Sequence, residues 1–278
     1  MQTLTPLGGA SEQAPVLVFA HANGYPPESY RLMLEPLARE FRVFTLEHRP
    51  FWSEGPAPWR LDWRAYADDL QTTLQAHFDE PVWLVGHSMG AIVSMMVALR
   101  NPKTVRGLVA LDPVLLPLKF WSLAQVLVRG LKRDIPIAKV ALNRPHGFQS
   151  HEEAFEFYRG KRPFRRMSDD ALRDYVLSAH RQVDGGGVEL RWTGAWEACV
   201  YRSAPYMLSR LRNLSLPMLG VAGQHSDVLT AATLKRWVAT VPQLQLEVLP
   251  GGHLVPVELP DVCADLISSF INKTEAAL

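Results

Sequence analysis

The chain has 278 residues, of which 47% are apolar, so it can bury the core of one large α/β domain and still carry an insertion. Its 29 basic residues are balanced by 28 acidic ones, so overall charge points neither to nucleic acid nor to a membrane surface. The two cysteines lack metal-ligand spacing, the first residues do not resemble a signal peptide, and no apolar run approaches the roughly 18 residues of a membrane span.

Strand-like and helix-like segments alternate along the first part of the chain. Short apolar runs predict buried strands at residues 16–20, 42–46, 82–85 and 105–112. Helices are predicted at residues 29–40, 62–78 and 91–99. This alternation predicts an α/β protein with a doubly wound, mostly parallel sheet.

The pentapeptide Gly86-His87-Ser88-Met89-Gly90 joins the strand at 82–85 to the helix at 91–99. The chain must reverse there within a few residues, which places Ser88 on a strained turn with its hydroxyl projecting outward. Such a turn leaves no room for side chains two residues either side of the serine, so glycine stands at both positions. The helix that follows points free N–H groups toward the site, where a developing anion would be stabilised.

In this strand–turn–helix setting the pentapeptide resembles the nucleophile elbow of the α/β-hydrolase superfamily, and the resemblance covers nearly the whole chain. Taken alone, the motif also fits a plain strand-to-helix turn with a capping serine. The resemblance implies that Ser88 is a nucleophile and that the N–H of Met89 donates to an oxyanion. Dehalogenases and epoxide hydrolases of the superfamily carry aspartate at this position, so neither activity is expected.

The loop His21-Ala22-Asn23-Gly24 follows the first predicted strand, where α/β-hydrolases carry a His-Gly-x motif. Ala22 departs from the glycine of that motif. The resemblance implies that Asn23 supplies the second oxyanion N–H and that His21 braces the loop beside the substrate. The Asn23 amide is a further candidate contact to the substrate oxygen, and an Asn-Gly turn without chemistry is the alternative.

A Gly/Pro-rich loop with three aromatic residues, Phe51, Trp52 and Trp59, follows the strand at 42–46. We expect it to cross the carboxyl ends of the strands, where open α/β sheets bind ligands. The three rings either line an acyl pocket or pack the loop onto the core. Trp52 is taken as a candidate substrate-binding residue, together with His21 and His87.

The strand pattern stops after residue 112 and resumes with strands at 217–223 and 245–249 and helices at 231–241 and 260–272. Helix-like segments lie between, at residues 119–132, 151–158 and 168–182. The resemblance implies that residues 115–205 form a helical cap. The hydrolase core would then comprise residues 1–114 and 206–278.

A serine nucleophile needs a histidine to take its proton and an acid to orient that histidine. In α/β-hydrolases these residues follow the order Ser, acid, His. Ser88, Asp227 and His253 have this order, each directly after a predicted strand, and Gly-Gly before His253 lets its loop approach the serine. Asp112 also ends a strand, and a minority of the superfamily takes its acid from that place. Asp227 is the expected acid and Asp112 the alternative.

These features predict a serine hydrolase that cleaves a small carboxylic ester through an acyl-enzyme on Ser88, with no metal and no cofactor. Thioesterase, lactonase, carbon–carbon bond hydrolase and interfacial lipase activities use the same triad. A non-catalytic relative that binds a small molecule is a further alternative. A basic cluster in the expected cap is either a solvated loop or a surface for anionic lipid or substrate; its members are Arg159, Lys161, Arg162, Arg165 and Arg166.

The expected partner is a small, ester-like molecule, with no nucleic acid and no membrane. Cys199 and Cys263 are expected to be reduced, which suggests a cytoplasmic protein. The oligomeric state is left open.

Overall fold

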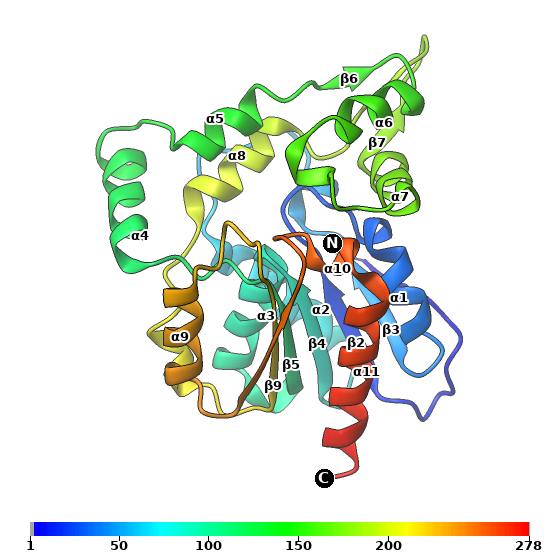
Figure 1. Cartoon of the computed structure of the whole chain (residues 1–278), viewed down its shortest axis with the longest axis vertical. Coiled ribbons are helices and arrows are strands. Elements are labelled where there is room, and N and C mark those ends of the chain that lie inside the picture. The colour runs from blue at the N-terminus through cyan, green and yellow to red at the C-terminus, as the bar shows by residue number, and fades with distance from the viewer. Residues whose placement is uncertain (1–2, 278) are drawn as a thin grey trace.

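A seven-stranded sheet forms the centre of the computed structural model, which describes residues 3–277 (Figure 1). Its strands are β1 (Leu4–Pro6), β2 (Val16–Ala20), β3 (Arg42–Leu46), β4 (Val82–His87), β5 (Val105–Leu111), β9 (Met218–Gly223) and β10 (Leu244–Leu249). They lie in the order β1-β3-β2-β4-β5-β9-β10. Only β1 runs antiparallel to its neighbour, so the predicted mostly parallel α/β sheet is confirmed.

Helices cover both faces of this sheet. They are α1 (Arg31–Leu37), α2 (Trp63–His77), α3 (Met89–Arg100), α9 (Ala231–Thr240), α10 (Val255–Glu258) and α11 (Pro260–Glu275). Successive strand residues point to opposite faces. In β2, Val16 and Val18 pack in the apolar cluster that contains α2, α3 and α9, whereas Leu17 and Phe19 pack in the cluster that contains α1 and α11. The sheet is therefore doubly wound.

The segment between β5 and β9 is helical and carries a second, small sheet. Its helices are α4 (Leu118–Gln125), α5 (Pro136–Leu142), α6 (His151–Arg159), α7 (Asp169–Ala179) and α8 (Gly194–Ser203), with a π-helical turn η4 (Val126–Gly130) after α4. The small antiparallel sheet has the order β6 (Gly147–Phe148), β8 (Val188–Leu190) and β7 (His180–Gln182). Strands of two or three residues are too short to show alternation, which is why the sequence predicted only helices here.

Short 3₁₀ turns complete the chain: η1 (Pro27–Tyr30), η2 (Arg49–Phe51), η3 (Pro102–Thr104), η5 (Arg162–Phe164) and η6 (Arg210–Asn213). No helix among residues 3–277 has both the length and the apolar character needed to cross a bilayer.

Polar contacts fasten the helical segment to the core on both sides. On one side, the indole of Trp63 in α2 donates to the carbonyl oxygen of Val200 in α8 at 3.1 Å. On the other, Arg31 in α1 pairs with Asp174 in α7 at 3.1 Å. The segment therefore lies over one end of the sheet (Figure 1), the end from which the loops after β2, β4 and β5 emerge.

Candidate active site

Three polar side chains meet at the carboxyl ends of the central strands. Ser88 follows β4, Asp112 follows β5, and His253 lies in the loop after β10. The Nε2 atom of His253 lies 3.0 Å from Ser88 Oγ, and its Nδ1 atom lies 2.7 Å from Asp112 Oδ1. A carboxylate only accepts hydrogen bonds, so Nδ1 carries the proton and Nε2 is free to accept from the serine hydroxyl.

The backbone at Ser88 has the strained geometry that the sequence predicted. Its φ of 54° lies in the left-handed region, which non-glycine residues rarely adopt. A Cβ on Gly86 would lie 2.6 Å from the backbone nitrogen of Ala91, and one on Gly90 would lie 2.0 Å from the carbonyl oxygen of Ala20. Only hydrogen fits at both positions. The tight turn therefore depends on the two glycines, and it brings the N-terminus of α3 against the end of β2.

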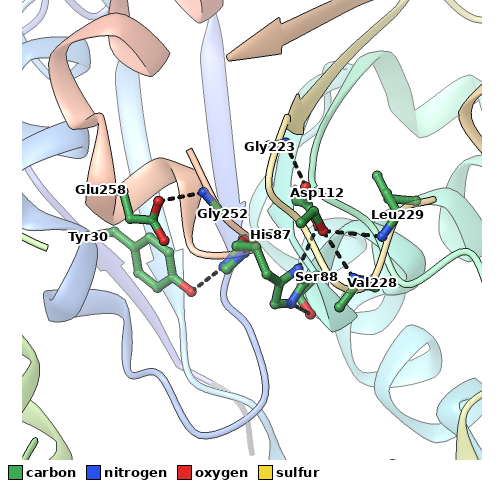
Figure 2. A network of polar contacts seen from close by, with 11 residues as sticks. Tyr30, His87, Ser88, Asp112, Gly223, Val228, Leu229, Gly252 and Glu258 are labelled. Carbon is green, nitrogen blue, oxygen red and sulfur yellow. Dashed lines mark hydrogen bonds and ion pairs between the residues drawn. The ribbon is translucent and has the colours of Figure 1, made fainter. Parts of the chain in front are cut away.

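The Asp112 carboxylate is fully buried and surrounded by donors (Figure 2). The N–H of Gly223 donates to its Oδ2 atom at 2.8 Å, and the Ser226 hydroxyl donates to its Oδ1 atom at 2.7 Å. Together with His253, these groups provide three hydrogen bonds to the carboxylate. A buried carboxylate held by three hydrogen bonds is fixed in direction.

Ser226 is itself fixed by the turn that follows β9. Its hydroxyl oxygen accepts from the N–H groups of Val228 and Leu229, both at 3.1 Å. The only hydrogen of the hydroxyl is thus directed at Asp112. Ser226 was not singled out from the sequence, because nothing but its place in the loop after β9 distinguishes it from other serines.

The expectation that Asp227 contacts His253 is wrong, and Asp112 takes this position. The N–H of Ser226 bonds back to the carbonyl of Gly223 at 3.0 Å, which closes a turn. In that turn Ser226 faces the buried carboxylate, whereas the next residue, Asp227, is exposed to solvent. Moreover, β5 lies directly beside β4 in the sheet, so the residue at its end is close to Ser88.

The two expected oxyanion donors lie at the same edge of the sheet, Asn23 in the loop after β2 and Met89 at the start of α3. Met89 is the first residue of α3, so its N–H has no acceptor within the helix. Asn23 is nearly buried, and its amide nitrogen donates to the carbonyl of Glu197 in α8 at 3.2 Å. Its side chain is therefore held by the helical segment rather than aimed at a substrate, and its backbone N–H remains the candidate donor.

His87 and His21 are buried braces rather than substrate-facing groups. His87 donates from Nε2 to the carbonyl of His253 at 2.8 Å and accepts at Nδ1 from the Tyr30 hydroxyl at 2.8 Å. The Tyr30 oxygen in turn accepts from the N–H of Ala22 at 3.2 Å. This chain of bonds connects the loop of His253 to the loop after β2. Periodicity did not indicate Tyr30, which lies in a 3₁₀ turn.

His21 holds the loop after β2 from its other side. It donates from Nδ1 to the carbonyl of Ala22 at 2.7 Å and accepts at Nε2 from the N–H of His48 at 3.1 Å. Both its nitrogens are occupied by the protein, and the ring is fully buried. The expectation that His21 braces the loop is therefore confirmed, whereas the expectation that it also binds the substrate is wrong.

The three aromatic residues of the loop after β3 pack against protein. The Trp52 indole donates to the carbonyl of Glu47 at 3.0 Å and lies beside Arg49. The Phe51 ring packs edge-on against Trp192, and Arg202 stacks on Trp59 at 3.8 Å. These contacts favour packing of the loop onto the protein over an acyl pocket. The expectation that Trp52 binds the substrate is therefore wrong.

Burial holds three neighbouring imidazoles neutral. The pKa values of His21 and His87 lie well below their usual value because of desolvation, reinforced by the nearby His48 and His253 respectively. Desolvation lowers the pKa of His48 to about 3. Neutral rings keep one nitrogen as an acceptor, which the hydrogen bonds of His21 and His87 require.

Among residues 3–277 there is no group of three or more His, Cys, Asp or Glu side chains arranged to hold a metal ion.

The fold and this arrangement of side chains define a class of proteins. The model of the family described as alpha/beta hydrolase fold matches residues 15–260, so the chain belongs to that family.

Its relatives act on different compounds. Over 231 residues the chain is 40% identical to lipase LipV of Mycobacterium tuberculosis, covering 79% of each chain. It is 24% identical over 259 residues to 2-(acetamidomethylene)succinate hydrolase of Mesorhizobium japonicum, covering 93% of this chain and 88% of the relative. The crystal structure of an E-2-(acetamidomethylene)succinate hydrolase superimposes with a TM-score of 0.77 at 22% identity, over 97% of this chain and 94% of that one.

The close contact at Gly90 leads to a first prediction. Gly90→Ala should lower the free energy of unfolding by several kcal/mol, because the new methyl group meets the backbone of β2. Helix propensity alone would act in the opposite direction, by about 1 kcal/mol in favour of alanine. Urea unfolding measures the change. Gly130→Ala is the matched control, since a Cβ there meets nothing within 4 Å. Equal stability of the two variants would contradict the close approach.

A second prediction follows from the buried histidines. Below the ordinary pKa of histidine, about 6.5, the unfolded chain takes up protons that folded His48 does not, so stability falls as pH falls toward 3. Between about pH 7.5 and about pH 5, His48 alone should lower the free energy of unfolding by about 2 kcal/mol. His48→Phe replaces the imidazole with a ring that does not titrate. Urea unfolding at about pH 7.5 and about pH 5 should show that the variant loses less free energy of unfolding than the wild type, by that amount. An unchanged pH dependence would mean that His48 is protonated when folded.

Proposed function

We propose that the chain is a cofactor-free serine hydrolase that cleaves a small carboxylic ester through an acyl-enzyme on Ser88. The observation that carries this proposal is the continuous hydrogen-bond chain from Asp112 through His253 to Ser88. The family membership supports the general reaction class.

In the proposed mechanism, Ser88 Oγ attacks the ester carbonyl while His253 Nε2 takes the hydroxyl proton. The imidazolium that forms is stabilised by Asp112, whose other hydrogen bonds hold the carboxylate in place. His253 then gives the proton to the leaving alcohol. Water then attacks the acyl-enzyme as His253 takes its proton; His253 returns this proton to Ser88 Oγ as the acyl–oxygen bond breaks, and the carboxylic acid is released.

The negative charge on the carbonyl oxygen would be stabilised by the backbone N–H groups of Asn23 and Met89. Support comes from the contact of Gly90 with the end of β2, which brings the start of α3 beside the loop that carries Asn23. The helix N-terminus adds a favourable electrostatic contribution.

An ester is proposed as substrate because the relative with 40% identity is named a lipase. We further propose that residues 115–205 act as a cap. This is supported by the low exposure of Ser88, 6%, and by the bond from Asn23 to α8. A cytoplasmic location is supported by the two cysteines, which are unpaired and buried.

A third prediction tests the nucleophile. A fluorophosphonate probe should label the wild-type protein, and Ser88→Ala should abolish labelling because the attacking oxygen is absent. Gel fluorescence measures labelling, and circular dichroism checks the fold. Ser226→Ala, which removes a different, half-buried serine hydroxyl near the site, should still be labelled. Labelling of Ser88→Ala to the wild-type level would reject Ser88. A panel of p-nitrophenyl esters and acyl-CoAs then distinguishes ester from thioester substrates.

A fourth prediction separates the two aspartates. Asp112→Asn should reduce turnover roughly ten-thousand-fold, because asparagine favours the wrong tautomer of the histidine. Asp227→Asn should change turnover less than about twofold, because that carboxylate is exposed and loss of a surface group has little effect. Kinetics on the best ester measure both, with thermal melting to confirm that each variant is folded. The reverse pattern, a folded but inactive Asp227→Asn beside an active Asp112→Asn, would overturn the assignment.

A further inference from the structure

The segment around α4 and α5 exposes an unusual number of apolar side chains. Phe120 is 69% exposed and Val140 is 72% exposed, and no residue of α4 is buried. Further large apolar side chains of this segment are also exposed: Leu118, Leu123, Val126, Leu131, Ile137 and Leu142. Figure 1 shows α4 at the outer edge of the molecule, joined to β5 and α5 by loops.

One side of α4 is fixed to the protein, so the apolar side chains on its other side are held in place. The Trp121 indole donates to the carbonyl of Ala204 at 3.0 Å, and Val128, two turns further along, is buried. Lys119, Leu123 and Val126 have the spacing i, i+4, i+7 and therefore share the opposite face. The exposed face is thus a defined surface of a folded helix.

The same segment is strongly basic. Five exposed cations lie between residues 114 and 143, namely Lys119, Arg129, Lys132, Arg133 and Lys139. None of them forms an ion pair with any residue in the described part of the chain, 3–277. The only acid of the segment, Asp134, is occupied by Arg202 at 2.5 Å.

We propose that residues 117–142 dock on the surface of an anionic lipid bilayer. Exposed apolar side chains interleaved with cations are what an interfacial helix presents, since the apolar groups enter the acyl boundary while the cations meet lipid phosphates. A second copy of the chain fits less well, because a two-fold contact would bring five unpaired cations against five others. This surface differs from the basic cluster at residues 159–166, where Arg159 is paired with Asp169 at 2.6 Å.

Docking of this kind is independent of hydrolysis, so it is tested with ether-linked lipids that an ester hydrolase cannot cleave. The full-length protein is sedimented with vesicles of phosphatidylcholine containing about one third phosphatidylglycerol, at about 0.1 M and about 0.5 M salt. We expect the protein to bind vesicles of pure phosphatidylcholine at least about tenfold more weakly than the anionic vesicles. Binding to the anionic vesicles should weaken at the higher salt concentration.

Two sets of variants locate the surface. Phe120→Ser/Leu123→Ser should weaken binding at least about tenfold by removing inserted side chains. Lys132→Gln/Arg133→Gln should weaken it about tenfold or more, since each cation near a lipid surface contributes severalfold. Val238→Ser/Val262→Ser is the matched control, because these valines are 45% and 43% exposed but lie on α9 and α11 of the core. It should bind like the wild type.

Three results would overturn the proposal. The first is a wild-type protein that stays in the supernatant with anionic vesicles. The second is that Phe120→Ser/Leu123→Ser and Lys132→Gln/Arg133→Gln both bind the anionic vesicles as tightly as the wild type. The third is a lipid-free dimer, seen by analytical ultracentrifugation, that Phe120→Ser/Leu123→Ser dissociates, because it would assign the face to a second copy. Circular dichroism and fluorophosphonate labelling equal to the wild type confirm that the variants are folded.

Discussion

The buried carboxylate of Asp112 is the group around which the loops at this end of the sheet are arranged. A buried carboxylate must be satisfied by donors, and here they come from the last residue of β9 and from the loops after β9 and β10. Because His253 is one of these donors, satisfying the carboxylate also points the imidazole at Ser88. Stability of the loops and readiness for catalysis thus rest on the same hydrogen bonds.

The local sequence pattern was sufficient to predict the strands of the sheet, the turn at Ser88 and the position of His253. The strands of the sheet are short apolar runs, and the glycines around Ser88 indicate a turn that only they permit. His253 was found because two glycines precede it after the last strand. The choice between Asp112 and Asp227 was not decided by pattern, because both follow apolar strands. It depends on which strand lies beside β4 and on the direction in which one turn faces, and both are properties of the folded chain.

Other features had no sequence signal at all. His21 and His87 look like candidate ligand contacts, yet their nitrogens are taken up by backbone groups and by Tyr30. Likewise, the sequence predicts a helix at residues 119–132, and only the packing shows that no residue of α4 is buried. Sequence predicts that a side chain is apolar or titratable, whereas its partner is decided by elements far away in the chain.

The short connection between Asp112 and α4 has a consequence for how such proteins diversify. Leu115, halfway along it, is fully buried, and its N–H bonds to the carbonyl of Pro113 at 2.8 Å. It acts as a fixed point, so movement or replacement of the chain beyond Pro117 need not be transmitted to the carboxylate. A helix of different length, polarity or direction can be exchanged there while the reacting atoms keep their spacing. Under the proposed docking of α4, exchanging this helix would change the surface that the protein binds while Ser88, His253 and Asp112 keep their arrangement.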